Sequence, residues 1–510
     1  MTNILETAVV SADQMRQIEE QLFAAGMPIA ALMEKAARLC SDRISALYPL
    51  SEITSVGVLV GPGHNGGDAL VIARELYLAG YQVKVYRPFF KLKQLTASHA
   101  NYTASLGITF NEDIKSLQDC QLIIDGLFGF GLTRTLPDNI IETIATINDW
   151  LQPVVSIDIP SGIHTDTGEV LGAAIRATHT LCLGMWKLAF FQDPALEYLG
   201  NIERIDFGIR PHHVWSVLPQ PAPIQQLTPA IAKEFLPIPR PQVTHKYQQG
   251  KLLLICGSLR YAGGAILTAL GARASGVGML FVAVPESLKH LLVSHLPEAL
   301  VIDCPENKDG AIASLPFSIT ELSNFDTVAC GPGLTLDAKS VVTKVLQVQC
   351  PLVLDADGLN ILSELETISS LKEREAKTIL TPHLGEFKRL FPDIEHPDRD
   401  RIVAVQTAAQ QSGAIVLLKG AKTAIADANG SIWLISESTP ALARGGSGDV
   451  LTGLMGGLLA QVKSDRQLST TVATAAWWHA QAGILAAKER TELGVDAWTL
   501  SQYLIRVVSS

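Results

Sequence analysis

Residues 56–69 read Val-Gly-Val-Leu-Val-Gly-Pro-Gly-His-Asn-Gly-Gly-Asp-Ala, and a helical pattern follows them. The apolar run at the start predicts a strand that is buried on both faces of a parallel sheet. Ligands of such sheets bind beyond the carboxyl ends of the strands, so the residues after Val60 are candidates for chemistry. Their glycines allow backbone N–H groups to approach a phosphate at a helix start, although a tight turn alone explains them as well. Asp68 is expected to cap the helix.

Similar apolar runs alternate with helical patterns along the whole chain. Each half is therefore expected to form an α/β domain with three layers, in which helices cover both faces of a sheet. The strands expected in the N-terminal half are Val56–Val60, Val83–Tyr86, Leu122–Asp125, Val154–Asp158, Thr180–Leu183 and Ile202–Asp206. Those expected in the C-terminal half are Leu252–Cys256, Leu280–Val284, Thr327–Cys330, Leu352–Asp355, Thr378–Leu380, Ile415–Lys419 and Ile432–Ile435.

A proline-rich stretch separates the two halves. Eight of the 26 prolines lie between Pro211 and Pro241. Because proline removes a backbone donor and blocks helices and central strands, this stretch is expected to be a connection. We expect a first domain over residues 1–215, a linker over 216–243 and a second domain over 244–510.

Composition excludes several classes of protein. The chain of 510 residues has a formal charge of −10 and no run of Lys or Arg, which argues against sequence-independent binding to nucleic acid. Its seven cysteines include no C-x-x-C pair and no zinc spacing, as in cytoplasmic proteins with reduced thiols. The N-terminus lacks the pattern of a signal peptide. The uncharged segment Gln467–Ala487 contains several polar residues and is expected to be a buried helix, so we expect no membrane span.

Two further loops of the N-terminal half carry polar residues at strand ends. One reads Asp125-Gly126-Leu127-Phe128-Gly129-Phe130-Gly131-Leu132-Thr133-Arg134, a glycine-rich turn whose arginine can hold an anion or simply be solvated. The other contains Asp158 in Asp-Ile-Pro-Ser-Gly, where a carboxylate can act as an acid or base or can bond to the loop.

Together these loops resemble the N-terminal domain of the YjeF family, the NAD(P)H-hydrate epimerases, over about Ser11 to Arg210. The resemblance implies a Rossmann-like fold, Asp158 as the acid/base group, and a potassium ion held by Asn65, Asp125 and Ser161. Ala69 departs from the family, which more often has glycine there. The resemblance implies that the hydrated nucleotide is bound by Asn65, Gly66, Gly67, Asp68, Ala69, Gly129, Phe130, Gly131, Leu132, Thr133, Arg134, Thr135, Asp158 and Lys187.

The most specific motif of the C-terminal half is Arg444-Gly445-Gly446-Ser447-Gly448-Asp449, which precedes an uncharged helical segment. Successive glycines at a helix start form a site for phosphate, and the adjacent aspartate is placed to take a proton from a hydroxyl group. Four other strand-end motifs accompany it, namely Cys330-Gly331-Pro332-Gly333-Leu334, Asp355-Ala356-Asp357-Gly358-Leu359-Asn360, Thr381-Pro382-His383-Leu384-Gly385-Glu386 and the basic, flexible loop Lys419-Gly420-Ala421-Lys422-Thr423.

These motifs resemble the ribokinase-like superfamily and, within it, the ADP- or ATP-dependent NAD(P)H-hydrate dehydratases, from about Thr244 onward. The resemblance implies Asp449 as the catalytic base, Mg²⁺ on the phosphates, and ADP or ATP as the co-substrate. Gly264-Ala265 departs from the Ala-Pro usual in the family. The implied substrate contacts are Gly264, Gly333, His383 and Asp449, and the implied nucleotide contacts are Lys419, Gly420, Ala421, Lys422, Thr423 and Gly448.

The sequence thus predicts a bifunctional, homo-oligomeric cytoplasmic repair enzyme. Its first domain would interconvert the R and S hydrates of NADH and NADPH, and its second would dehydrate the S form. A ribokinase-type small-molecule kinase with an accessory domain is the alternative, because the Gly-Gly-Ser-Gly-Asp motif alone fits both. A nucleotide-sensing module without catalysis is a third hypothesis, which predicts that Asp158 is dispensable.

Overall fold

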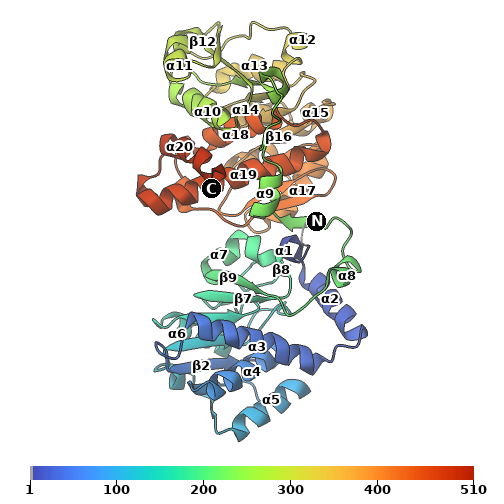
Figure 1. Ribbon diagram of the computed structural model, residues 1–510, viewed down its shortest axis with the longest axis vertical. Coiled ribbons are helices and arrows are strands. Elements are labelled where there is room, and N and C mark those ends of the chain that lie inside the picture. The colour runs from blue at the N-terminus through green and yellow to red at the C-terminus, as the bar shows by residue number, and fades with distance from the viewer. Residues whose placement is uncertain (1–3, 510) are drawn as a thin grey trace. The chain divides into compact units, whose positions relative to one another are not determined.

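The computed structural model of the chain describes residues 4–509, which form two compact units (Figure 1). The first unit ends at Pro223 and the second begins at Ile224. Each unit has its own sheet and its own buried core.

A parallel sheet of seven strands forms the centre of the first unit. Its order runs outward in both directions from its first strand, as in the Rossmann fold, so that the chain reverses between β2 and β5. The strands in spatial order are β4 (Thr109–Asn111), β3 (Gln82–Tyr86), β2 (Ser55–Val60), β5 (Leu122–Gly126), β6 (Val154–Ile157), β7 (His179–Leu183) and β9 (Asn201–Ile205).

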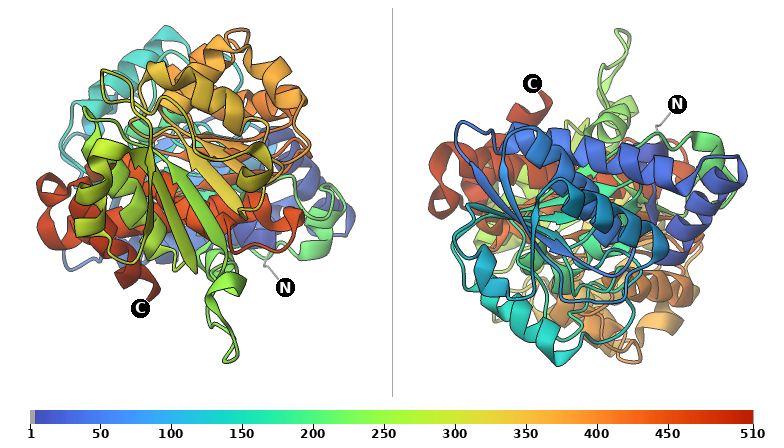
Figure 2. Two further views of the ribbon diagram at one scale, coloured as in Figure 1. Left: turned by 90° about the horizontal axis from the view of Figure 1, so that it is seen from above. Right: turned by 90° about the horizontal axis from the view of Figure 1, so that it is seen from below.

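Helices cover both faces of this sheet. Val56, Val58 and Val60 pack in one core with α3 and α4, whereas Leu59 of the same strand packs in another core with α6 (Figure 2, right). Successive side chains of β2 thus pack against helices on opposite faces of the sheet, which confirms the expected three layers. The helices of this unit are α1 (Ile4–Thr7), α2 (Ala12–Ala24), α3 (Ile29–Leu47), α4 (His64–Leu78), α5 (Gln94–Ser105), α6 (Asp138–Asn148), α7 (Leu196–Leu199) and α8 (Pro211–Trp215).

The second unit is built on a sheet of ten strands. It is parallel except that β18 runs antiparallel to both of its neighbours, and the chain reverses between β11 and β14. In spatial order the strands are β10 (Ile224–Gln226), β19 (Ile432–Ile435), β18 (Thr423–Ala426), β17 (Ile415–Leu418), β16 (Thr378–Leu380), β15 (Leu352–Leu354), β14 (Thr327–Cys330), β11 (Lys251–Ile255), β12 (Met279–Pro285) and β13 (Leu300–Cys304).

This second sheet also lies between two helical layers. The red helices α18 and α19 lie on one side of it and the orange helices of residues 357–412 on the other (Figure 2, left). The helices are α9 (Pro229–Glu234), α10 (Ala262–Ala274), α11 (Lys289–His295), α12 (Ile319–Leu322), α13 (Lys339–Val345), α14 (Asp357–Glu364), α15 (Thr367–Lys372), α16 (Leu384–Leu390), α17 (Arg401–Ser412), α18 (Ser447–Leu459), α19 (Leu468–Arg490) and α20 (Ala497–Val508).

The proline-rich stretch differs from the predicted linker over 216–243. Strand β10 pairs with β19 at the edge of the second sheet, and Ile231 and Leu236 are buried in the core of that unit. Prolines at an edge strand and at the first turn of a short helix are compatible with regular structure. The second unit therefore begins about twenty residues before the predicted boundary at 244.

The uncharged segment predicted as a buried helix lies in α19, most of which is buried. Within residues 4–509, no helix is both long enough and apolar enough to cross a membrane. The prediction that Asp68 caps its helix is wrong. The helix α4 begins at His64 after the cap residue Gly63, so Asp68 lies beyond the first turn.

Candidate active sites

The first candidate site lies where the sheet of the first unit reverses its strand order. The strands β2 and β5 end side by side there, because Val60 pairs with Gly126. Ligands of open α/β sheets bind in the crevice at such a point.

Glycines bring the backbone segments around this crevice into direct contact. A Cβ atom on Gly61 would lie 1.7 Å from the carbonyl oxygen of Leu127, and one on Gly66 would lie 2.0 Å from that of Gly61. A Cβ atom on Gly126 would likewise collide with the methyl group of Ala69. These glycines are needed for packing, and the side chain of Ala69 is buried against Gly126.

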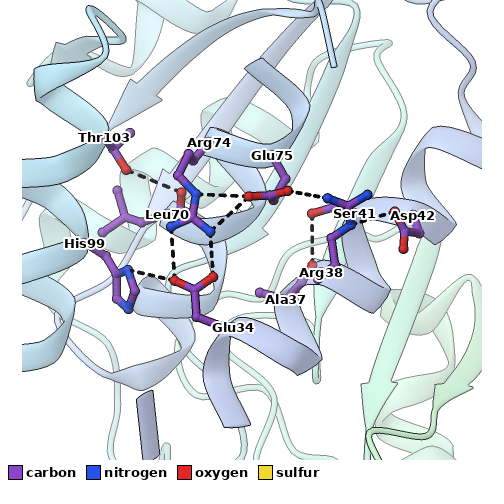
Figure 3. Close-up of polar contacts among 10 residues, drawn as sticks. All are labelled: Glu34, Ala37, Arg38, Ser41, Asp42, Leu70, Arg74, Glu75, His99 and Thr103. Atoms are coloured by element: carbon purple, nitrogen blue, oxygen red, sulfur yellow. Dashed lines mark hydrogen bonds and ion pairs between the residues drawn. The ribbon is translucent and has the colours of Figure 1, made fainter. Parts of the chain in front are cut away.

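Charged side chains connect α4 to the neighbouring helix α3 (Figure 3). Arg74 donates two hydrogen bonds to Glu34, at 3.0 and 2.6 Å, and two more to one oxygen of Glu75. Arg38 of α3 donates to the other oxygen of Glu75 at 2.6 Å. A bidentate pair of this kind has a fixed geometry, so the network holds α4 in place beneath the site.

Asp158 and Lys187 form a buried ion pair at the end of β6. The ammonium nitrogen of Lys187 lies 2.6 Å from Oδ1 of Asp158, and both side chains are almost completely buried. The other carboxylate oxygen accepts a hydrogen bond of 2.9 Å from the backbone N–H of Phe130. Burial disfavours the ammonium, but Asp158 more than offsets this effect and raises the pKa of Lys187. Lys187 therefore stays charged and holds Asp158 opposite it.

Asp125 and Ser161 lie next to this pair. The carboxylate of Asp125 accepts hydrogen bonds from the hydroxyl of Ser161 at 2.6 Å, the N–H of Ser161 at 2.9 Å and the hydroxyl of Ser156 at 2.8 Å. Burial raises the pKa of Asp125, although these bonds oppose the rise. The side-chain nitrogen of Asn65 is buried and forms no hydrogen bond with any residue from 4 to 509.

The loop after β5 closes over the same place. A Cβ atom on Gly129 would lie 3.0 Å from Oδ2 of Asp158 and 3.3 Å from Oδ1 of Asn65, so the predicted loops do converge. Further along the loop Leu132 is buried. Thr133, Arg134 and Thr135 are exposed, and their side chains lie on the solvent side of the loop.

Two further carboxyl groups surround the ion pair. Burial and the nearby charges of Asp158 and Glu19 raise the pKa of Asp68 well above its ordinary value. Burial, followed by the charge of Asp158, raises the pKa of Glu19 to about 7. Sequence reasoning missed Glu19, because it lies in an ordinary amphipathic helix far from any motif.

The second candidate site is formed at the N-terminus of α18. Gly446 precedes the helix with a φ of 87°, a left-handed conformation that favours glycine. Burial raises the pKa of Asp449 in the first turn to about 7, and the nearby carboxylate of Asp355 adds to the rise. A Cβ atom on Gly264 would lie 3.2 Å from Oδ2 of Asp449 and 4.0 Å from Gly333. The structure thus brings these predicted substrate contacts together.

A second buried ion pair lies beside Asp449. Lys419 donates to Oδ1 of Asp355 at 2.7 Å, and Thr452 of α18 donates to Oδ2 at 2.6 Å. Burial opposes ionisation of Asp355, but Lys419 holds its pKa below the ordinary value. A Cβ atom on Gly448 would lie 3.4 Å from the Lys419 ammonium, so the glycine loop adjoins a positive charge. Asp355 begins one of the predicted strand-end motifs, but no role in the site was predicted for it.

The remaining predicted contacts differ in their surroundings. Thr423 begins β18, so the predicted loop from Lys419 connects two antiparallel strands as a hairpin loop. Lys422 donates to the carbonyl of Ser436, and burial lowers its pKa. The ring of His383 caps α16 by accepting from the N–H of Gly385 at 3.0 Å, and it is more than half exposed. Gly420 packs against Arg401.

Strained backbone marks both sites. Asp158, Thr335 and Ala356 have φ values of 71°, 68° and 48°, which side chains rarely adopt. Each follows a strand end that contributes to a site. Strain of this kind persists only where the surrounding structure enforces it, and it is typical of functional positions.

Comparison with known proteins finds relatives of both halves of the chain. The family model of the YjeF-related protein N-terminus matches residues 29–189, and that of NAD(P)H-hydrate dehydratase matches residues 252–506. A bifunctional NAD(P)H-hydrate repair enzyme from Synechocystis sp. is 58% identical over 98% of this chain and 94% of its own length. Another from Thermosynechococcus vestitus is 52% identical, with 98% and 97% covered.

The chain belongs to the bifunctional NAD(P)H-hydrate repair enzymes. Both resemblances drawn from the motifs are therefore confirmed. Among solved structures, the ADP/ATP-dependent NAD(P)H-hydrate dehydratase from Bacillus subtilis, co-crystallised with ATP/Mg²⁺, is 33% identical with a TM-score of 0.45. The match covers 53% of this chain and 92% of that protein. As a NAD(P)H-hydrate repair enzyme, the chain carries one candidate site in each matched region.

Proposed function

We propose that the first unit interconverts the R and S hydrates of NADH and NADPH, and that the second dehydrates the S hydrate with ADP or ATP. The observation that supports this proposal is the pairing of two different buried sites in one chain. One has a carboxylate fixed by a buried lysine, and the other has a glycine loop at a helix start beside a carboxylate with a raised pKa.

In the first site, Asp158 would act as the acid/base group at the hydrated ring. Loss of the C6 hydroxyl leaves a ring cation, and addition of water to its other face inverts the carbon centre. An ionised carboxylate held by Lys187 and the N–H of Phe130 is preorganised to stabilise that cation. The predicted contacts from Asn65 to Ala69 and from Gly129 to Thr135 would hold the nucleotide around it.

We propose Asn65, Asp125 and Ser161 as ligands of a potassium ion. The residues present fit such an ion, because they offer amide, carboxylate and hydroxyl oxygens, and hard cations prefer oxygen ligands. The unpartnered side-chain amide of Asn65 can turn its oxygen to a cation, since amide orientation follows from the surrounding partners. Bound there, the ion would supply positive charge near the phosphates.

In the second site, Asp449 would take the proton of the C6 hydroxyl as that oxygen attacks the terminal phosphate of the nucleotide. The new C6–O–phosphate bond then breaks, phosphate leaves with the electron pair, and loss of the adjacent C5 proton restores the ring double bond. With ADP the other product is AMP. The N–H groups before α18 and Lys419 would hold the transferred phosphate.

Mg²⁺ would neutralise phosphate charge in this reaction. The carboxylates of Asp355 and Asp357 both act on Asp449, so they lie at the site, and carboxylates are the oxygen donors that Mg²⁺ accepts alongside phosphates. The proposed contacts of the nucleotide are Lys419 to Thr423 with Gly448. For the substrate we propose Gly264, Gly333, His383 and Asp449.

A single assay tests the proposal. Mixed epimers of NADH hydrate are incubated with the full chain, Mg²⁺ and ADP or ATP, and the absorbance of the restored dihydronicotinamide ring is followed. We expect complete recovery with one of the nucleotides. Recovery with neither would contradict both activities.

The variant Asp158→Asn separates the two activities. It should leave the S fraction consumed rapidly while the R fraction follows at the slow uncatalysed rate. A small-molecule kinase would instead yield a stable phosphorylated product, and a module without catalysis would leave Asp158 dispensable. The homo-oligomeric state and the cytoplasmic location stay predictions.

A further inference from the structure

If Asp158 is engaged by Lys187, one step of the proposed epimerisation still lacks a proton donor. The C6 hydroxyl is a poor leaving group and needs a proton to depart as water. Asp158 accepts a hydrogen bond from Lys187 at one oxygen and from Phe130 at the other, so both of its oxygens are already engaged as acceptors. A proton donor must therefore come from elsewhere in the site.

Helix α2 brings a second carboxyl group to the pair. Val10 pairs with Lys187 between β1 (Val9–Val10) and β8 (Trp186–Lys187), and the N–H of Ala12 donates to Asp166 at 2.8 Å. The side chain of Met15 lies against Gly184, where a Cβ atom would be 2.8 Å from its methyl carbon. Glu19 follows Met15 by four residues, so it lies on the same face of the helix.

The surroundings of Glu19 are those of a proton donor. Its side chain is half-buried and forms no hydrogen bond or ion pair among the described residues. The charged groups that act on it are Asp158, Lys187, Arg16 of its own helix and Asp68 of α4. The carboxyl groups of Glu19, Asp158 and Asp68 thus act on one another, and burying all three as anions beside a single ammonium would be costly.

We propose that Glu19 donates the proton with which the C6 hydroxyl leaves as water, while Asp158 remains ionised beside the ring cation. This role rests on the proposed epimerase function. The C6–O bond breaks with its electron pair on oxygen, and the lone pair of the ring nitrogen forms the N1–C6 double bond. Water then adds to the opposite face, Asp158 as the base takes the proton that this water releases, and the proton returns through solvent to the Glu19 carboxylate.

The choice between Glu19 and Asp68 follows from their acidity. A general acid is most effective when its pKa lies near the working pH. The pKa of Glu19 is raised to about 7, chiefly by burial and then by Asp158, whereas that of Asp68 is raised much further. Because the acid form is required, the epimerisation rate should fall as the pH rises through about 7.

The test is the interconversion of R and S hydrates by the full chain without nucleotide, followed by chromatography across pH. Glu19→Gln should lower kcat by roughly 10²–10⁴-fold, a range typical of general acid catalysis, with little change in KM. It should also remove the fall in rate near pH 7, and it should leave dehydration of the S hydrate unchanged. Glu20→Gln, which alters the exposed neighbour, is the matched control and should behave as wild type.

Two outcomes would overturn the role of Glu19. One is a Glu19→Gln enzyme that interconverts the hydrates at the wild-type rate. The other is a wild-type rate that does not fall between pH 6 and 8, roughly one unit either side of the expected pKa. If Glu19→Gln unfolds, Glu19→Asp is the second variant. It keeps a carboxyl group but places it farther from the ring, so it should retain the pH dependence at a lower rate. A wild-type chain that interconverts no hydrate would contradict the proposed function itself.

Discussion

Asp449 shows how its surroundings decide the chemistry of one side chain. Burial raises its pKa to about 7, Asp355 adds to this rise, and Lys419 opposes it. A carboxylate with such a pKa is a stronger base than an exposed aspartate, whose pKa is about 4. The aspartate is also fixed within the first turn of a helix, next to the glycines that would hold phosphate.

We therefore expect dehydration to depend on the ionised form of Asp449. Activity should rise as the pH increases through about 7 and level off above it, because the base is protonated below its pKa. Asp449→Asn should lower kcat by roughly 10²–10⁴-fold, as for other general bases, and remove this rise. Steady-state rates with the S hydrate between pH 5.5 and 9 would measure both, over a range of about two units around that pKa. A variant with unchanged rates would mean that the base is another residue.

At the scale of elements, two helices of the second unit meet backbone to backbone. A Cβ atom on Gly453 of α18 would lie 1.7 Å from the carbonyl oxygen of Thr268 in α10, and one on Gly271 would lie 2.1 Å from that of Val450. Such contacts fix the axial position of α18, and with it the position of Asp449. Glycine in a helix interior lowers helix stability, and here it is needed because any side chain would block the close packing of the two helices.

Gly453→Ala should force the two helices apart. We expect it to lower the free energy of unfolding of the second unit by about 1–3 kcal/mol, the usual effect of overpacking, and to reduce dehydration. Gly263→Ala in α10 is the control, since a Cβ atom there would meet nothing within 4 Å and stability should be kept. Thermal unfolding of both variants would measure the difference. Equal melting temperatures would show that the helices adjust without cost.

At the scale of the whole molecule, each unit has its own core and its own candidate site. A ligand that binds one folded unit stabilises only that unit, by about 2.7 kcal/mol at a hundred times its Kd. We expect ADP with Mg²⁺ to raise a single transition in calorimetry, the one that Gly453→Ala lowers. Adenosine with Mg²⁺ is the control without phosphates. A shift of the other transition would place the nucleotide in the first unit.

Much of the fold could be predicted, because buried parallel strands are continuous apolar runs. The strands that were missed are edge or short strands such as Thr109–Asn111 and Leu300–Cys304, whose side chains are partly exposed and lack this pattern. Motif residues such as Asp158 and Asp449 could also be predicted from strand ends. Partners such as Glu19 and Asp355 could not be assigned, because their role arises from contacts between segments far apart in the sequence.

The short strand β10 has a consequence for the integrity of the second sheet. It covers the outer edge of β19 by parallel pairing over Ile224 to Gln226. A fragment that began at Thr244 would expose this edge, and unpaired strand edges template association with other chains. The prolines around β10 cannot donate to a further strand, so they end the pairing there. We therefore expect these few residues to protect the second unit against aggregation.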